Sequence, residues 1–184
     1  MNQINDTPFS YLVKVGHISA NPVSVRLEAN AQERAGLARL WNILSVDSLK
    51  AELQIAKWKK DGVRIKGSVQ ARIAQACVVT LEPVPAEIDE AIDQIFVPEN
   101  SRLARRISEE SSELLLDPDG EDMPEPFVGD TIDAGVVVAE AVALAIDPYP
   151  RKEGIVFGDH IEDDGKNDKK PNPFAVLKDW KKDE

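Results

Sequence analysis

Two runs of alternating residues, joined by one short turn, constrain the fold more than any other feature of the chain. In residues 49–55, Leu, Ala, Leu and Ile alternate with Lys50, Glu52 and Gln54, and residues 63–73 alternate in the same way. A period of two gives a strand with one apolar and one polar face. Asp61-Gly62, between the runs, is a pair favoured in hairpin turns. The sequence therefore predicts an antiparallel hairpin that is buried on one face.

Other segments predict further strands and a first helix. Apolar runs indicate strands at residues 9–15, 21–29, 77–81 and 88–97. Asn30, followed three residues later by Glu33, is close to a capping box and predicts the start of a helix. The apolar stripe of that helix consists of Leu37, Leu40, Trp41 and Leu44.

A second helix is predicted to begin at residues 130–133 and to end at Ile146, before Asp147-Pro148. It is apolar almost all round, so we expect it to be largely buried. Together the elements predict an α+β fold: an antiparallel sheet or a partly closed β-barrel, with this buried apolar helix and a short C-terminal helix.

The domain organisation follows from composition. With 184 residues, 42% of them hydrophobic, the chain is long enough to build a core. We predict a single α+β domain over residues 1–157, with an acidic loop at 107–129, then a flexible linker at 158–171 and a C-terminal helical motif at 172–184. In that motif we expect a helix with an N-cap, a proline at the first helical position and two apolar residues on one face. We interpret these residues as a candidate docking site. The helix would dock either in cis on the chain's own sheet or on a partner. The docking residues are Asn172, Pro173, Phe174 and Leu177.

The distribution of charge limits the ligands. The net charge is −11, which argues against wholesale binding of polyanions. However, residues 107–150 contain 12 acidic side chains and no lysine or arginine, so the first half of the chain is free to present a basic surface. The acidic residues 109–130 are interpreted as a mimic of nucleic acid, as a shield for a basic partner or as a solvated loop.

One basic cluster surrounds the predicted hairpin turn and includes an aromatic residue. Basic side chains pair with phosphates, and an exposed ring stacks on an unpaired base, so we predict an RNA contact there. The alternative is a solubilising turn in which the tryptophan folds onto the sheet. The cluster consists of Lys57, Trp58, Lys59, Lys60, Arg64 and Lys66.

Motifs for catalysis are absent from the sequence. It contains no glycine-rich phosphate loop, no G-x-S-x-G and no H-E-x-x-H, and His17 and His160 lie far apart. Cys77 is predicted to be a buried, inert thiol. We therefore expect no enzyme activity, cofactor, metal or small-molecule substrate. The apolar run 134–146 is too short to span a bilayer and the N-terminus has no export signal, so we expect a cytoplasmic protein with no membrane contact.

Three segments, at residues 69–98, 130–150 and 171–181, resemble the YceD family of large ribosomal RNA subunit accumulation proteins, in the family's order. The resemblance extends over residues 10–182. It implies a bacterial-type cytosolic factor needed for normal levels of 23S ribosomal RNA. Many members carry C-x-x-C at Cys77, but this chain reads Cys77-Val78-Val79-Thr80, so a metal or redox role does not carry over.

Two hypotheses about the ligand remain open. In the first, a non-enzymatic factor in large-subunit biogenesis contacts pre-ribosomal RNA, through the basic cluster at the hairpin. In the second, a protein-binding adaptor uses its acidic segment and C-terminal motif to hold a basic large-subunit ribosomal protein. A third hypothesis, a nuclease that acts on precursor RNA, has no motif to support it.

Overall fold

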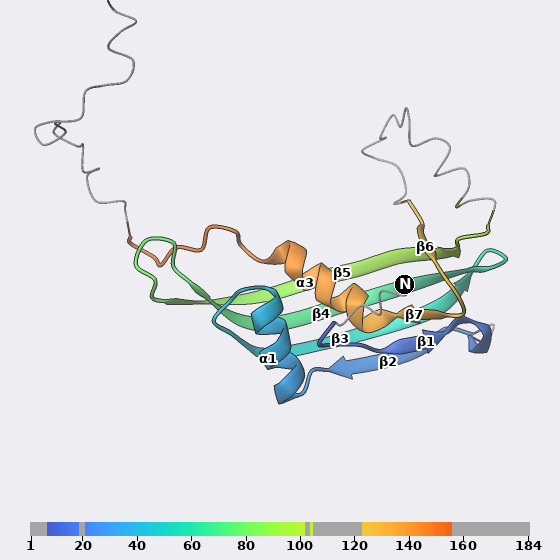
Figure 1. Cartoon of the computed structure of the whole chain (residues 1–184), viewed down its shortest axis with the longest axis horizontal. Coiled ribbons are helices and arrows are strands. Elements are labelled where there is room, and N and C mark those ends of the chain that lie inside the picture. Colours follow the sequence, from blue (N-terminus) through green and yellow to red (C-terminus); the bar gives the residue numbers. More distant parts are fainter. Residues whose placement is uncertain (1–6, 19–20, 102–103, 105–122, 156–184) are drawn as a thin grey trace, which may run out of the picture. The chain divides into compact units, whose positions relative to one another are not determined.

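A five-stranded sheet with the strand order β2-β3-β4-β5-β6 dominates the computed structural model, which describes residues 7–18, 21–101, 104 and 123–155 (Figure 1). The neighbours pair antiparallel, except that β5 and β6 pair parallel. The strands are β2 (Val23–Glu28), β3 (Ser45–Trp58), β4 (Gly62–Ala76), β5 (Pro83–Pro98) and β6 (Glu125–Phe127).

Smaller elements complete the fold. Strands β1 (Leu12–Lys14) and β7 (Thr131–Asp133) form a separate two-stranded antiparallel sheet, and a 3-10 helix, η1 (Val15–His17), follows β1. The helices are α1 (Ala31–Leu40) and α3 (Ala134–Ala145). The chain divides into two units, Met1–Lys152 and Glu153–Glu184, and all of these elements belong to the first.

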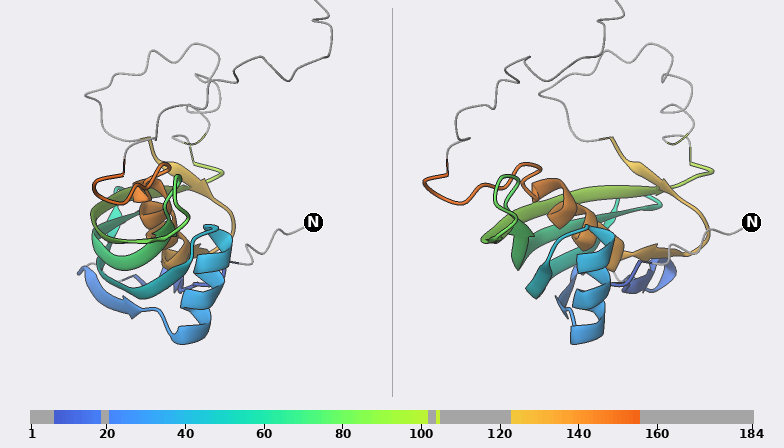
Figure 2. Two further views of the ribbon diagram at one scale, coloured as in Figure 1. Left: turned by 90° about the vertical axis from the view of Figure 1, so that its left-hand side faces the viewer. Right: turned by 60° about the vertical axis from the view of Figure 1, so that its left-hand side comes forward.

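The predicted hairpin is confirmed and is longer than the alternating runs. Strands β3 and β4 pair from Ser45 with Ala74 to Trp58 with Gly62. The residues that alternate in the sequence alternate between faces, and Leu53, Ile55, Ile65 and their apolar neighbours are buried in the core. The curved sheet carries α1 and α3 on one side (Figure 2). Its other face is polar, as the alternation requires.

The first helix begins where predicted and ends earlier. Asn30 accepts hydrogen bonds from the backbone N–H groups of Gln32 and Glu33, and the Glu33 carboxylate accepts one from Asn30, which completes the capping box. The helix ends at Leu40, because Asn42 takes a left-handed conformation with φ of 53°. Leu40 and Leu44 are consequently exposed, so the predicted four-residue stripe is wrong at those two positions.

The predicted strand at residues 77–81 is wrong, because these residues form the turn between β4 and β5. The N–H of Leu81 donates to the carbonyl of Cys77 at 2.9 Å, and Leu81 has a φ of 61°. Of the two predicted alternatives, a sheet or a partly closed barrel, the described residues form the sheet, in which β2 and β6 occupy opposite ends. The fold is thus a mixed α+β fold with an open sheet.

Helix α3 is buried over part of its surface. Six of its residues are buried, among them Val138 and Val142, but Glu140 and Leu144 are exposed. Neither helix of the described residues is long and apolar enough to cross a membrane. The predicted linker 158–171 and the docking residues Asn172, Pro173, Phe174 and Leu177 lie outside the described residues, as does most of the acidic loop 107–129.

Candidate functional site

The predicted RNA-contacting cluster lies at the tip of the β3–β4 hairpin. Trp58 ends β3 opposite Gly62, and the Lys59 ammonium lies 4.0 Å from the centre of the Trp58 ring, a cation–π contact. A Cβ on Gly62 would lie 2.8 Å from a ring atom of Trp58, so the glycine makes room for the indole on the sheet. The ring is therefore half-buried on the polar face and keeps part of its surface open to a ligand.

Two members of the cluster are already engaged in ion pairs. The Arg64 guanidinium donates two hydrogen bonds of 2.7 Å to the Asp93 carboxylate on β5, and the Lys66 ammonium lies 3.2 Å from the same group. These bonds, chiefly that from Arg64, lower the pKa of Asp93 to about 2. Arg64 and Lys66 are therefore partly neutralised and less suited to bind phosphate.

Three lysines at the tip have no such partner. Among the described residues, Lys57, Lys59 and Lys60 form no ion pair, and all three are exposed. Lys57 is in register with the buried Val63 and so lies on the helix side of the sheet, whereas Trp58 lies on the polar face. The structure thus reduces the predicted cluster to a smaller tip of these three lysines and Trp58.

The Asp93 ion pairs predict a dependence of stability on acid pH. The pKa of Asp93 is lower in the folded state, so its stabilising effect is complete above about pH 4 and is lost as the pH falls toward 2. Both side chains of the main pair are partly exposed, so we expect Asp93→Asn to cost less than about 1 kcal/mol at pH 6. Urea unfolding of both proteins should show this difference shrinking between pH 4 and pH 2. A difference that stays constant over this range would contradict the assignment.

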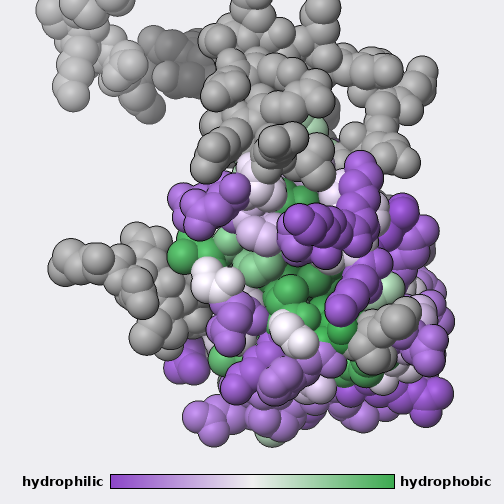
Figure 3. Space-filling model, turned by 90° about the vertical axis from the view of Figure 1, so that its right-hand side faces the viewer, coloured by the Kyte–Doolittle hydropathy of each residue, from purple (hydrophilic) through white to green (hydrophobic). Residues whose placement is uncertain are grey.

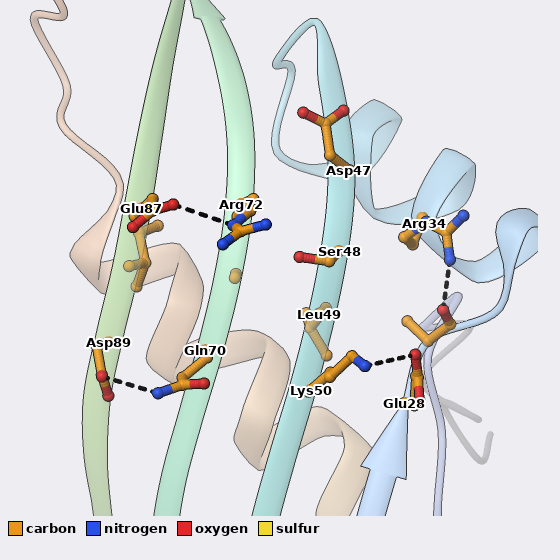
Figure 4. A pocket seen from close by; sticks show the side chains of 13 residues that line it. Glu28, Arg34, Asp47, Ser48, Leu49, Lys50, Gln70, Arg72, Glu87 and Asp89 are labelled. Carbon is orange, nitrogen blue, oxygen red and sulfur yellow. Dashed lines mark hydrogen bonds and ion pairs between the residues drawn. The ribbon is translucent and has the colours of Figure 1, made fainter.

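A polar hollow of about 630 Å³ lies on the same face of the sheet, further from the tip (Figure 4). Arg72 pairs with Glu87 at 3.0 Å, Gln70 donates to Asp89 at 3.0 Å, and Lys50 lies 3.0 Å from Glu28. Basic and acidic side chains therefore alternate across the hollow. Such a surface offers no concentrated charge of one sign, and we assign it no ligand.

The Cys77 turn combines a buried thiol with several hydrogen-bond donors. A hydrogen bond from the Thr80 hydroxyl, with backbone N–H groups of Lys152, Thr80 and Val79, lowers the pKa of the buried Cys77 to about 6. Thr80 thus occupies the position of the second cysteine of C-x-x-C and supports the thiolate. The described residues include no group of three or more His, Cys, Asp or Glu that could hold a metal ion.

Sequence reasoning missed two surfaces. One is an apolar patch where β1, β2 and β3 meet, with exposed Tyr11, Leu12 and Val23. Figure 3, which views the molecule from the right-hand side of Figure 1, shows apolar side chains at the centre of that side, surrounded by polar ones. The other is a groove between β5 and α3 that contains Glu90 and Glu140. Exposed apolar surface of this kind often marks an interaction site. No local sequence pattern predicts either surface, because each forms from segments that are distant in the chain.

A comparison with protein families identifies the chain. The family described as "Large ribosomal RNA subunit accumulation protein YceD" matches residues 65–181. The chain belongs to the YceD family. The resemblance seen in the sequence is confirmed, and the match covers β4 from Ile65 onward, β5, β6, β7, α3 and most of the C-terminal residues. It begins at Ile65, not near residue 10, so β1, β2, α1 and β3 lie outside it. No curated protein and no solved structure matches this chain.

Proposed function

We propose that this YceD protein is a non-enzymatic factor in the biogenesis of the large ribosomal subunit, where it supports the synthesis, processing or accumulation of 23S ribosomal RNA. The observation that carries the proposal is the family match over residues 65–181, because the family is named for accumulation of the large ribosomal RNA subunit. This role places the protein in the cytoplasm, where ribosomes are assembled.

We infer that the contact with pre-ribosomal RNA is made by the hairpin tip. Its lysines carry no ion pair among the described residues, so phosphate groups can pair with them without displacing a carboxylate. Trp58 lies beside them with part of its ring exposed, and an aromatic face accepts a base of any sequence. The tip is thus suited to single-stranded RNA without strong sequence preference.

We expect Lys59→Glu combined with Lys60→Glu to weaken RNA binding while the fold is kept. If both lysines contact phosphates of a single strand, the slope of log K against log salt concentration should become shallower by about 1.4. Titration of a labelled single-stranded RNA from precursor 23S sequence, at several salt concentrations, measures this slope. The matched control is Arg26→Glu with Lys50→Glu, which changes the net charge equally at exposed ion pairs elsewhere on the sheet.

The same variants test the role in cells. Depletion of the protein should lower the ratio of 23S to 16S ribosomal RNA, and the control variant should restore it while the hairpin variant does not. An unchanged ratio on depletion would contradict the proposed function. A normal ratio with the hairpin variant would contradict only the assignment of RNA contact to the tip.

A second candidate function is supported by one specific observation. Partial desolvation raises the pKa of Glu140, and repulsion from the nearby Glu125 carboxylate raises it further. Neither carboxylate forms an ion pair with a basic side chain of the described residues. This arrangement favours an adaptor that holds a basic protein, such as a large-subunit ribosomal protein.

A further inference from the structure

We propose that the groove between β5 and α3 binds a basic, extended segment of another protein, which adds as a strand to the free edge of β5. The inference deepens the second candidate function, the adaptor, and does not depend on RNA contact at the hairpin tip. It is carried by three features of one place in the fold: a free strand edge, an unpartnered apolar wall and unpaired carboxylates.

The groove runs along the backbone of β5. Its volume is about 430 Å³, and six consecutive residues of β5, Glu90 to Ile95, line it. Consecutive residues of a strand point to opposite faces, so a hollow that contacts all six lies against the edge of the strand. The facing wall is formed by residues of α3 spaced three or four apart, which share one side of the helix. They are Val137, Glu140, Ala141, Leu144 and Ala145.

The outer edge of β5 is free over most of its length in the described part of the chain. Strand β6 pairs only with Phe96–Pro98, at the end of β5 near the hairpin tip. At the other end, Pro83 and Pro85 lack N–H groups and discourage pairing. Between them, the edge beside the groove presents unpaired backbone groups, and an extended segment can add to such an edge by backbone hydrogen bonds.

The apolar wall is incompletely covered by the fold. Leu144 is 89% exposed although it lies on a mostly apolar helix, and it lines the groove together with Val137 and the buried Ile92. A strand added to β5 would place alternate side chains against this wall. An aliphatic side chain, or the aliphatic stem of a lysine or arginine, would then cover Leu144.

The charge of the groove defines the chemistry of the partner. Glu90 is in register with the buried Val69, so it lies on the helix side of the sheet with Glu140. The Glu125 carboxylate accepts a hydrogen bond of 2.6 Å from Gln94, which also lines the groove. Among the described residues, none of the three carboxylates forms an ion pair. Lysine or arginine side chains of a partner would supply the missing counter-charges, whereas RNA would be repelled.

The same charge argument disfavours this chain's own neighbouring segment as the occupant. Residues 105–122 contain seven acidic and two basic side chains. An acidic segment would add to the repulsion between carboxylates in the groove. A basic segment from another protein is therefore the better match.

The test uses the full chain and a fluorescein-labelled synthetic peptide of alternating lysine and valine, with a glutamate–valine peptide as the probe control. Fluorescence anisotropy should show binding of the lysine peptide only. Glu90→Lys with Glu140→Lys should weaken this binding by at least about tenfold. The matched control, Glu87→Lys with Asp89→Lys, makes the same charge change on the opposite face of β5 and should change affinity by less than about threefold.

Hydrogen exchange tests the mode of binding, because an added strand should protect backbone amides among residues 90–95.

Leu144→Ser should weaken peptide binding without loss of stability, since the side chain is exposed. Equal losses in the two charge variants, or no added protection, would overturn the proposal. Two further results would also overturn it. Self-association that is abolished in the Glu90→Lys, Glu140→Lys variant would assign the groove to a second copy of the chain. Tighter peptide binding by Phe174→Asp would assign it to the chain's own C-terminal residues. If the peptide-binding test fails but depletion of the protein still lowers 23S ribosomal RNA, only the groove proposal is overturned and the proposed function stands.

Discussion

Gly67→Ala is expected to destabilise the protein by more than about 3 kcal/mol, because the site has no space for a methyl group. Gly67 lies in the middle of β4, opposite Leu53. A Cβ there would overlap the carbonyl oxygen of Glu52 and lie 2.9 Å from the Cα of Leu53. Both contacts are with backbone of β3, so no side-chain rotation relieves them. Strands β3 and β4 would have to separate near the centre of their pairing.

The measurement is the melting temperature and the urea midpoint of purified protein. A loss of about 3 kcal/mol should lower the melting temperature by roughly 6 to 12 °C in a protein of this size. Gly16→Ala is the matched control, because an added Cβ there meets nothing within 4 Å and the backbone is not left-handed. Equal stability of the two variants would show that β3 and β4 tolerate a wider separation at Gly67.

The hairpin and the first helix were predictable because their signals are local. Alternation over residues 49–55 and 63–73, with Asp61-Gly62 between them, specifies strand, turn and buried face within a short window. The Asn30 capping box needs only four residues. In both cases, the interacting groups are neighbours in the sequence.

The turn at residues 77–81 was not predictable in this way, because its conformation depends on distant contacts. The β-branched Val78 and Val79 favour a strand by propensity. In the fold, the N–H of Val78 donates to the carbonyl of Pro150 at 2.9 Å, and Gln75 donates to the carbonyl of Asp147 at 2.7 Å. These partners are about 70 residues away in the chain, so the propensities of residues 77–81 cannot predict these contacts.

The residues of the hairpin tip could be predicted from the sequence, but the ion pairs that neutralise two of them could not. The sequence places Arg64 and Lys66 beside the tip lysines, yet it does not reveal that Asp93 lies opposite them on β5. That pairing follows from the register of two long strands. For the same reason, the groove proposed as a protein-binding site was missed, since Glu90 and Glu140, which line it, belong to two elements that are distant in the chain.

Asp133→Ala is expected to cost about 2 to 4 kcal/mol, because one carboxylate joins the N-terminal segment to the start of α3. One oxygen accepts from the N–H groups of Gly135 and Val136, at 2.9 and 3.3 Å, and caps the helix. The same oxygen accepts from the N–H of Tyr11 at 2.7 Å, and the other oxygen accepts from the Ser10 hydroxyl. Loss of a cap typically costs about 1 kcal/mol, and hydrogen bonds to a charged group about 1.5 to 3 kcal/mol.

Asp133→Asn separates these contributions. An asparagine caps a helix as well as an aspartate and keeps one oxygen, which can accept from Gly135, Val136 and Tyr11, but its amide NH2 cannot accept the bond from Ser10. We therefore expect it to lose less than half as much unfolding free energy as Asp133→Ala in urea titrations. Equal losses would mean that the oxygen shared by the helix cap and Tyr11 contributes little beside the negative charge and the bond from Ser10. Tyr11 and Ser10 lie outside the family match whereas Asp133 lies inside it. A large loss would thus show that the first residues of the chain hold in place the helix that forms one wall of the β5–α3 groove.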